Sequence, residues 1–236
     1  MTLSVVVPAF NEEMTVGAVI EELRGLSPPP EIIAVDDGST DGTLGILRSV
    51  AGPDLTVIAQ ASNRGKGCAV RAGIAAATGD IIALHDADLE LAAAPLLEMA
   101  AIIDEGRADA VFGYRFSDDG GGTACRTGNA CLTAIANRLH DATLADVSCG
   151  QKVFRGDLLR SLPLRAEGFE LEAELTALTL QAGARIIEVP VSYRPRSRSD
   201  GKKVRYFRDG LRALLTLLKL RRPPGAMLAE EERVHP

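Results

Sequence analysis

The feature that most constrains the fold is the regular alternation of short apolar runs with helical segments over the first 113 residues. Apolar runs of strand length, rich in β-branched residues, occupy positions 3–7, 32–35, 55–59, 81–84 and 110–113. Helical segments lie between them, at about 11–23, 43–50, 65–77 and 93–104. This alternation predicts an α/β fold with a mostly parallel central sheet and helices on both faces.

The second half of the chain is less regular. Helical patterns occupy about 127–139, 171–181 and 204–220, and strand-like patterns occupy 150–154 and 186–193. Pro190 predicts that the last strand lies at an edge of the sheet, because proline cannot donate a ladder hydrogen bond. We expect residues 1–222 to form a single domain and residues 223–236 to form a disordered C-terminal tail.

Acidic side chains follow three of the predicted strands. Asp86 and Asp88 come after the run 81–84, and Glu12 and Asp37 follow the first two strands. The carboxyl ends of parallel strands meet at the edge where α/β proteins bind ligands, so we expect these carboxylates to line one crevice. Asp86 and Asp88 repel each other unless positive charge lies between them, and a hard divalent cation prefers such oxygen ligands. The alternative for this pair is a polar turn in which Asp caps the next helix.

Two widespread nucleotide-binding motifs are absent. A dinucleotide site of the Rossmann type needs Gly-x-Gly-x-x-Gly after the first strand, where this chain has residues 8–12, PAFNE. The glycines at 65 and 67 lack the spacing of a P-loop. We therefore expect neither an NAD enzyme nor a Walker-type NTPase. An acidic crevice can instead hold a nucleotide by its ribose and base, with a metal at the phosphates.

Charge is spread unevenly along the chain. The net charge is −6, yet residues 194–222 contain eleven Lys or Arg and two Asp. This asymmetry predicts a basic face for an anionic partner. Few aromatic residues accompany it, so we do not expect a nucleic-acid partner.

No apolar run reaches the roughly 18 residues that span a bilayer. The N-terminus has no signal-peptide pattern, and the four cysteines have no metal-ligand spacing. We expect a cytoplasmic protein, either free or peripheral at the inner face of the membrane.

The motifs at the strand ends resemble those of glycosyltransferase family 2. The N-terminal motifs are VVVPAFNEE (5–13), VDDGSTDGT (35–43), NRGKG (63–67) and DADLE (86–90). Later motifs resemble the dolichol-phosphate mannosyltransferase-like branch, the polyprenyl-phosphate hexosyltransferases. These are GYRF (113–116), KVFR (152–155), GFELE (168–172) and GKK (201–203). The resemblance covers about residues 3–221.

This resemblance implies a GT-A fold, a nucleotide-sugar donor of the GDP-mannose or UDP-glucose type, and Mg²⁺ or Mn²⁺ as cofactor. The residues that it assigns to the nucleoside are Pro8, Phe10, Glu12, Val35 and Asp37. Those that it assigns to the diphosphate and metal are Asp86, Ala87 and Asp88. Glu90 falls where the mannosyl enzymes place a Gln near the metal, so it is expected as a further metal ligand.

The implied acceptor is a polyprenyl phosphate, dolichyl or undecaprenyl, and the implied reaction is an inverting hexose transfer. Its expected catalytic residues are Asp86, Asp88 and Arg115. The residues expected at the acceptor phosphate are Arg115, Arg126, Arg196 and Lys202. The acceptor phosphate is already an anion near pH 7, so it can attack the anomeric carbon without a dedicated general base. The metal would offset charge on the leaving diphosphate.

Two alternatives remain open. Transfer to a hydroxyl of a saccharide or small molecule would need a general base, for which Glu170 and Glu172 are the candidates. A catalytically silent, membrane-binding module of the same fold is the other alternative. Glu170 stands where mannosyl members often have Lys, which leaves the identity of the hexose open.

The last predicted helix has the pattern of a membrane-surface helix. Its apolar stripe consists of Phe207, Leu211, Leu214, Leu215 and Leu218. The basic residues Arg205, Arg208, Arg212 and Lys219 fall on another face. A basic amphipathic helix can lie in the interface between water and lipid, and a polyprenyl acceptor resides there. The alternative is that the apolar stripe packs on the sheet.

Overall fold

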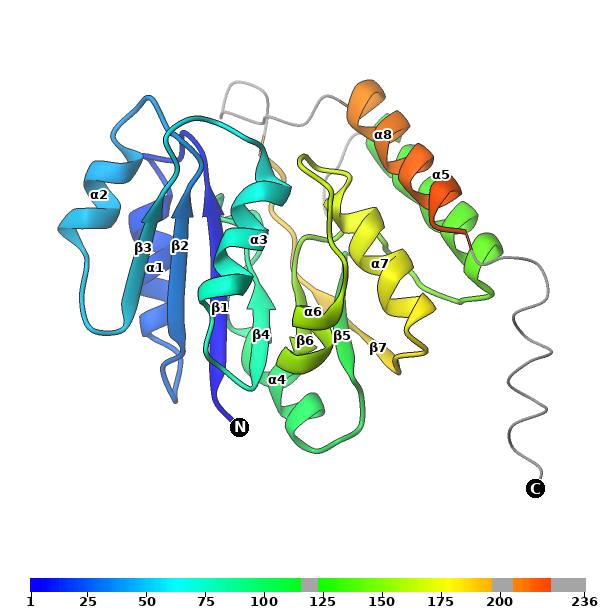
Figure 1. Cartoon of the computed structure of the whole chain (residues 1–236), viewed down its shortest axis with the longest axis horizontal. Helices are drawn as coiled ribbons and strands as arrows, with labels where there is room; N and C mark the ends of the chain where they lie inside the picture. Colours follow the sequence, from blue (N-terminus) through cyan, green and yellow to red (C-terminus); the bar gives the residue numbers. More distant parts are fainter. Residues whose placement is uncertain (116–122, 197–205, 222–236) are drawn as a thin grey trace.

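The structure is a computed structural model that describes residues 1–115, 123–196 and 206–221 (Figure 1). For residues 123–126 and 206 the structure describes the backbone and not the side chain. Within the described ranges, seven strands form one sheet in the order β3-β2-β1-β4-β6-β5-β7. The strands are β1 (Leu3–Ala9), β2 (Glu31–Asp36), β3 (Leu55–Ala59), β4 (Ile81–Leu84), β5 (Ala110–Arg115), β6 (Lys152–Arg155) and β7 (Ile186–Val191).

The sheet is parallel except at β6. β1 pairs in parallel with both β2 and β4, β2 pairs in parallel with β3, and β5 pairs in parallel with β7. β6 lies antiparallel between β4 and β5. The prediction of a mostly parallel α/β sheet is therefore confirmed, and β7, which contains Pro190, lies at an edge as predicted.

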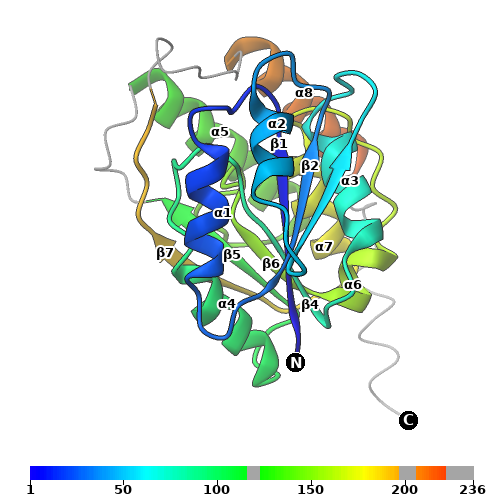
Figure 2. The ribbon, with the colours of Figure 1, turned by 90° about the vertical axis from the view of Figure 1, so that its left-hand side faces the viewer.

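Helices cover both faces of the sheet (Figure 2). One apolar core joins the sheet to α1 (Val16–Arg24), α2 (Thr43–Ser49) and α4 (Pro95–Asp104). The core on the other face joins it to α3 (Lys66–Ala76), α6 (Gly156–Ser161) and α7 (Leu171–Gln181). Because both faces are covered, the central strands are apolar on both sides, which explains their continuous apolar sequences.

Two further helices lie outside α7, toward the carboxyl ends of the strands (Figure 1). These are α5 (Thr123–His140) and α8 (Tyr206–Lys219), which pack on each other and on α7 around Ala136, Ala177 and Leu217. The side of α8 that contains Asp209 and Leu217 is buried. Its other side exposes Phe207 by 89%, Leu211 by 47%, Leu215 by 46% and Leu218 by 44%. The alternative in which this apolar stripe packs on the sheet is therefore wrong.

Candidate active site

A cavity of about 580 Å³ lies at the carboxyl ends of β1, β2 and β4. The parallel pairing places the end of β1 between those of β2 and β4, so loops distant in sequence meet there. The cavity brings together most of the residues that the sequence nominated for the donor. These are Pro8, Phe10, Glu12, Asp37, Asp86, Ala87, Asp88 and Glu90. We call it the donor cavity.

Val35 is the nominated donor residue whose side chain does not line this cavity. It is fully buried in the core beneath α3, where its methyl groups pack near Gly73. Val35 lies within β2, where α3 covers the sheet, so its side chain stays in the core. Asp37, just beyond the end of the strand, does reach the cavity.

Asp37 joins the end of β2 to the loop that precedes α3. Its two carboxylate oxygens accept hydrogen bonds from the backbone N–H groups of Arg64 and Gly65, each at 2.8 Å. Burial, with a contribution from the charge of Asp36, raises the pKa of Asp37 against the opposing effect of those N–H groups. Asp37 thus fixes the wall of the cavity as well as lining it.

Asp88 is held in a tight turn after β4. Its Oδ1 accepts the backbone N–H of Glu90 at 3.0 Å, and Leu89 between them has a left-handed φ of 57°. Burial first, and then the charges of Asp86 and Glu90, raise the pKa of Asp88 to about 6. A divalent cation at Asp86 and Asp88 would relieve this repulsion, so the two carboxylates fit a metal of the Mg²⁺ or Mn²⁺ type.

Glu90 is not positioned as a third ligand of such a metal. Within the described residues, no three His, Cys, Asp or Glu side chains converge on one point. The Oε1 atom of Glu90 instead accepts the backbone N–H of Arg196 at 2.8 Å. A metal held by Asp86 and Asp88 would therefore take its remaining ligands from the diphosphate and from water.

Arg196 lies in the donor cavity, although the sequence nominated it for the acceptor phosphate. Its guanidinium donates two hydrogen bonds to Glu12, at 2.8 and 3.0 Å, and lies 3.4 Å from Oδ2 of Asp88. Burial would lower the pKa of Arg196, but Glu12 and Asp88 outweigh it and the pKa is raised. Lys202 lies outside the described residues, as does the side chain of Arg126 in α5.

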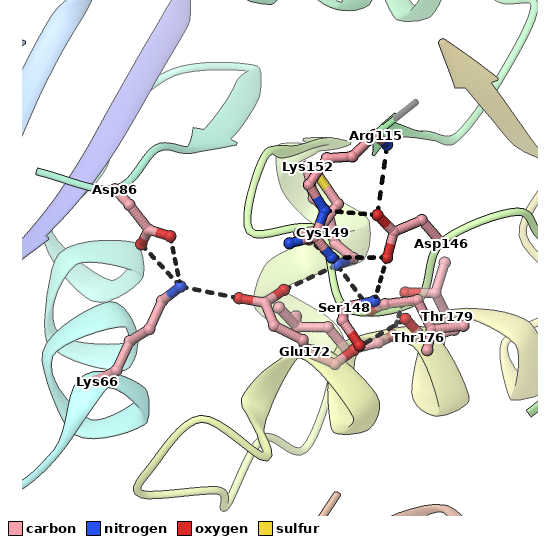
Figure 3. Close-up of polar contacts among 12 residues, drawn as sticks. Lys66, Asp86, Arg115, Asp146, Ser148, Cys149, Lys152, Glu172, Thr176 and Thr179 are labelled. Atoms are coloured by element: carbon pink, nitrogen blue, oxygen red, sulfur yellow. Dashed lines mark hydrogen bonds and ion pairs between the residues drawn. The ribbon is translucent and has the colours of Figure 1, made fainter. Parts of the chain in front are cut away.

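Sequence reasoning missed a buried chain of charges behind Asp86 (Figure 3). The ammonium of Lys66 lies 2.7 and 2.9 Å from the two oxygens of Asp86, and 3.1 Å from Oε1 of Glu172. The other oxygen of Glu172 lies 2.8 Å from the Lys152 ammonium, which is fully buried. The motif GKG at 65–67 contains Lys66 and could have indicated its role, but it was interpreted only as a turn that precedes a helix.

A second cavity, of about 620 Å³, shares Lys66, Asp86, Asp88 and Glu90 with the donor cavity. It extends between α5 and α8 and is mainly apolar away from that charged end. The apolar lining includes Leu132, Ile135, Val147, Phe207, Leu211, Leu214 and Leu217. We call it the apolar cavity. It thus combines a charged end at Asp86 with a hydrocarbon-lined body.

Arg115 lines the charged end of the apolar cavity. Its guanidinium donates to both oxygens of Asp146, at 2.7 and 2.9 Å, and lies 5.1 Å from the ring centre of Tyr193. Burial would lower the pKa of Arg115, but Asp146 more than offsets this effect. Arg115 is therefore a permanently charged group with a fixed orientation, as a phosphate-positioning residue requires.

This sheet and its acidic cavity are those of a GT-A glycosyltransferase. The structure is similar to glucosyl-3-phosphoglycerate synthase from Mycobacterium tuberculosis, with a TM-score of 0.72 and 25% identity. That alignment covers 95% of this chain and 81% of the synthase. The synthase has been crystallised with Mn²⁺, UDP and glucosyl-3-phosphoglycerate.

The sequence model of glycosyl transferase family 2 matches residues 4–162, and the chain belongs to this family. It is 32% identical over 174 residues to dodecaprenyl-phosphate galacturonate synthase of Rhizobium johnstonii, covering 71% of this chain and 52% of that protein. The chain thus spans about half the length of that relative. It is also 30% identical to dolichyl-phosphate hexose transferase of Haloferax volcanii, covering 83% of this chain and 84% of that protein.

These relatives support the resemblance to the polyprenyl-phosphate hexosyltransferase branch of the family. Among the helices that the structure describes, none is both long and apolar enough to cross a bilayer.

Proposed function

We propose that the protein transfers a hexose, with inversion, from a nucleotide sugar to a polyprenyl phosphate, with Mg²⁺ or Mn²⁺ held by Asp86 and Asp88. The donor cavity supplies carboxylates for a nucleoside and a cation, and two relatives are named as enzymes of polyprenyl phosphates. The alternative acceptor is a small phosphorylated molecule, as in the name of the mycobacterial synthase.

The apolar cavity is the observation that favours the lipid. A polyprenyl phosphate is an amphiphile, and this cavity offers Lys66 and Arg115 at one end and leucine and isoleucine side chains beyond them. A small polar acceptor would leave most of that lining in contact with water, whereas an isoprenoid chain would cover it. The acceptor would therefore place its phosphate beside the donor cavity and its chain between α5 and α8.

The chain's own residues can support the transfer in the following way. A cation bound at Asp86 and Asp88 would supply Lewis acidity at the leaving diphosphate. Arg115, held by Asp146, would orient the acceptor phosphate toward the anomeric carbon. One phosphate oxygen would form the new bond to that carbon as the bond to the diphosphate breaks on the opposite side, which inverts the configuration.

The environment of Glu172 disfavours the hydroxyl-acceptor alternative. A general base for a hydroxyl must be free to accept a proton. Glu172 is buried, and its two carboxylate oxygens lie 3.1 Å from the Lys66 ammonium and 2.8 Å from the Lys152 ammonium. Glu170, the other candidate, accepts backbone N–H groups of Glu167 and Gly168 through its Oε1. The Oε2 atom of Glu170 is buried without a hydrogen-bond partner, so the ion pairs of Glu172 are the observation that counts against a general base.

A panel assay tests this proposal. UDP-hexoses and GDP-hexoses are combined with a short polyprenyl phosphate, 3-phosphoglycerate or a neutral saccharide, in Mg²⁺, Mn²⁺ or EDTA. We expect transfer to the polyprenyl phosphate with either metal and none in EDTA. Equal or faster transfer to 3-phosphoglycerate or to the saccharide would contradict the lipid acceptor.

A matched pair of variants on α5 tests the role of the apolar cavity. Cys131 is exposed and lines this cavity, whereas Ala134 is exposed on the same helix and does not line it. We expect Cys131→Trp to raise the KM for the polyprenyl phosphate about tenfold, because the indole would occupy space needed by the chain. Ala134→Trp should leave that KM unchanged, and both variants should keep the affinity for the nucleoside diphosphate.

A further inference from the structure

Lys66 is fixed in place by its neighbours in the chain. It is the first residue of α3, and the preceding Gly65 has a φ of 97°, which favours glycine. A Cβ atom at Gly67 would lie 2.2 Å from the carbonyl oxygen of Ala166, so the start of α3 packs directly on that backbone. The Lys66 side chain extends from this rigid point between Asp86 and Glu172 (Figure 3).

The two carboxylates that share Lys66 differ in their surroundings. Glu172 is anchored by Lys152, whose ammonium also donates to the carbonyl oxygens of Val147 and Cys149. The Asp86 side chain is 27% exposed and lines both cavities, whereas the Glu172 side chain is 10% exposed. Glu172 lines the apolar cavity alone, whereas Asp86 is the carboxylate of this charge chain that also reaches the donor cavity.

A cation bound at Asp86 would meet the Lys66 ammonium at close range. Two positive charges that share one carboxylate repel each other, and the repulsion is strong in a site with little water. A diphosphate in the donor cavity would change this balance, because its negative charge attracts both the cation and the ammonium. Lys66 would then weaken binding of the cation when no diphosphate is present. It would strengthen binding of the cation and the diphosphate together.

We propose that Lys66 is a positioning residue that couples the binding of the divalent cation to the binding of the donor diphosphate. The inference rests on the proposed donor and cation, and it adds the reason why neither should bind well without the other. Coupling between two ligands is reciprocal, so the cation should strengthen diphosphate binding by the same factor as the diphosphate strengthens cation binding.

Lys66→Met tests the inference through binding rather than through turnover. Mn²⁺ affinity is measured by electron paramagnetic resonance of free Mn²⁺, without nucleotide and with UDP or GDP, whichever binds the wild-type protein more tightly. We expect Lys66→Met to bind Mn²⁺ alone about tenfold more tightly than wild type, because a competing charge is gone. The factor by which the nucleotide tightens Mn²⁺ binding should fall by about tenfold or more.

Two further variants separate charge from structure. Lys66→Arg keeps the positive charge and should bind Mn²⁺ alone as weakly as wild type. Arg48→Met removes one positive charge from the exposed surface of α2 and should change neither affinity. If Lys66 only held Asp86 in place, Lys66→Met would bind Mn²⁺ more weakly than wild type in every condition, because Asp86 would lose its fixed position.

The results distinguish the failure of this inference from the failure of the proposed function. If wild type shows coupled binding of Mn²⁺ and nucleotide, and Lys66→Met binds Mn²⁺ alone no more tightly, then Lys66 does not couple them and the proposed function stands. If wild type binds neither Mn²⁺ nor a nucleoside diphosphate, the proposed donor chemistry is overturned and the inference falls with it.

Discussion

Asp88 illustrates, at the scale of single residues, how a buried carboxylate in the candidate site reduces stability. Burial and the charges of Asp86 and Glu90 hold its pKa at about 6, above the ordinary value for aspartate. The folded protein therefore binds the Asp88 proton more tightly than the unfolded chain does. The stability lost through Asp88 grows as the pH rises from about 4 to about 6 and is fully present above that range.

We predict that Asp88→Asn abolishes turnover and yet stabilises the metal-free protein at neutral pH. The amide removes the buried charge and keeps an acceptor for the N–H of Glu90. The free energy of unfolding should rise by about 2 kcal/mol at pH 7.5 and by about half as much at pH 5. Urea unfolding at the two pH values measures both. A gain that does not depend on pH would show that Asp88 is not the group that titrates.

The residues of the site that could be predicted are those whose position follows from local sequence. Asp37, Asp86 and Asp88 come at strand ends, and strand ends in a parallel sheet meet at one edge. The pairing of Arg196 with Glu12 could not be predicted, because it joins segments that only the tertiary fold brings together. The buried ion pair of Lys152 and Glu172 is similar, since nothing in the sequence distinguishes Lys152 from an exposed lysine.

At the scale of elements, periodicity predicted most strands and helices but not every arrangement. β3, β4 and α7 have the predicted bounds, and α5 extends beyond the predicted 127–139 at both ends. α6 was not predicted, because six residues are too few to show a helical period. The antiparallel direction of β6 was not predicted either, because a four-residue strand carries no local signal of its direction.

Two glycine-to-alanine changes in helices should have opposite effects on stability. Gly67→Ala would place its Cβ 2.2 Å from the carbonyl oxygen of Ala166, so the start of α3 must move. We expect it to lower the free energy of unfolding by about 2 kcal/mol and to weaken nucleotide binding by displacing Lys66. Gly45→Ala in α2 meets open space and should raise stability by about 0.5–1 kcal/mol. Denaturant unfolding compares them, and equal effects would contradict the packing argument.

For the molecule as a whole, α8 connects the apolar cavity to an exposed apolar surface. Phe207 and Leu211 belong both to the lining of the cavity and to the exposed stripe of α8. A lipid could therefore pass from a bilayer beneath that stripe into the cavity without exposing its chain to water. Arg208 and Arg212, which the sequence placed on a membrane-facing basic stripe, line the donor cavity. The apolar stripe rather than these arginines should thus dominate membrane contact.

Leu215 and Leu218 allow membrane docking to be tested apart from the chemistry, because both are exposed and neither lines the donor cavity or the apolar cavity. We predict that Leu215→Asp combined with Leu218→Asp abolishes flotation with anionic vesicles. Transfer to a long polyprenyl phosphate in those vesicles should fall at least about tenfold, since two apolar contacts are replaced by charges that the anionic surface repels. Transfer to a short polyprenyl phosphate in solution should be unchanged, because the cavities are intact.

Leu215→Met combined with Leu218→Met keeps the apolar surface and should retain both activities. If the aspartate variant folds normally but loses both activities, the stripe acts on the reaction itself rather than on membrane docking. If the variant retains both activities, α8 does not dock the enzyme on the bilayer.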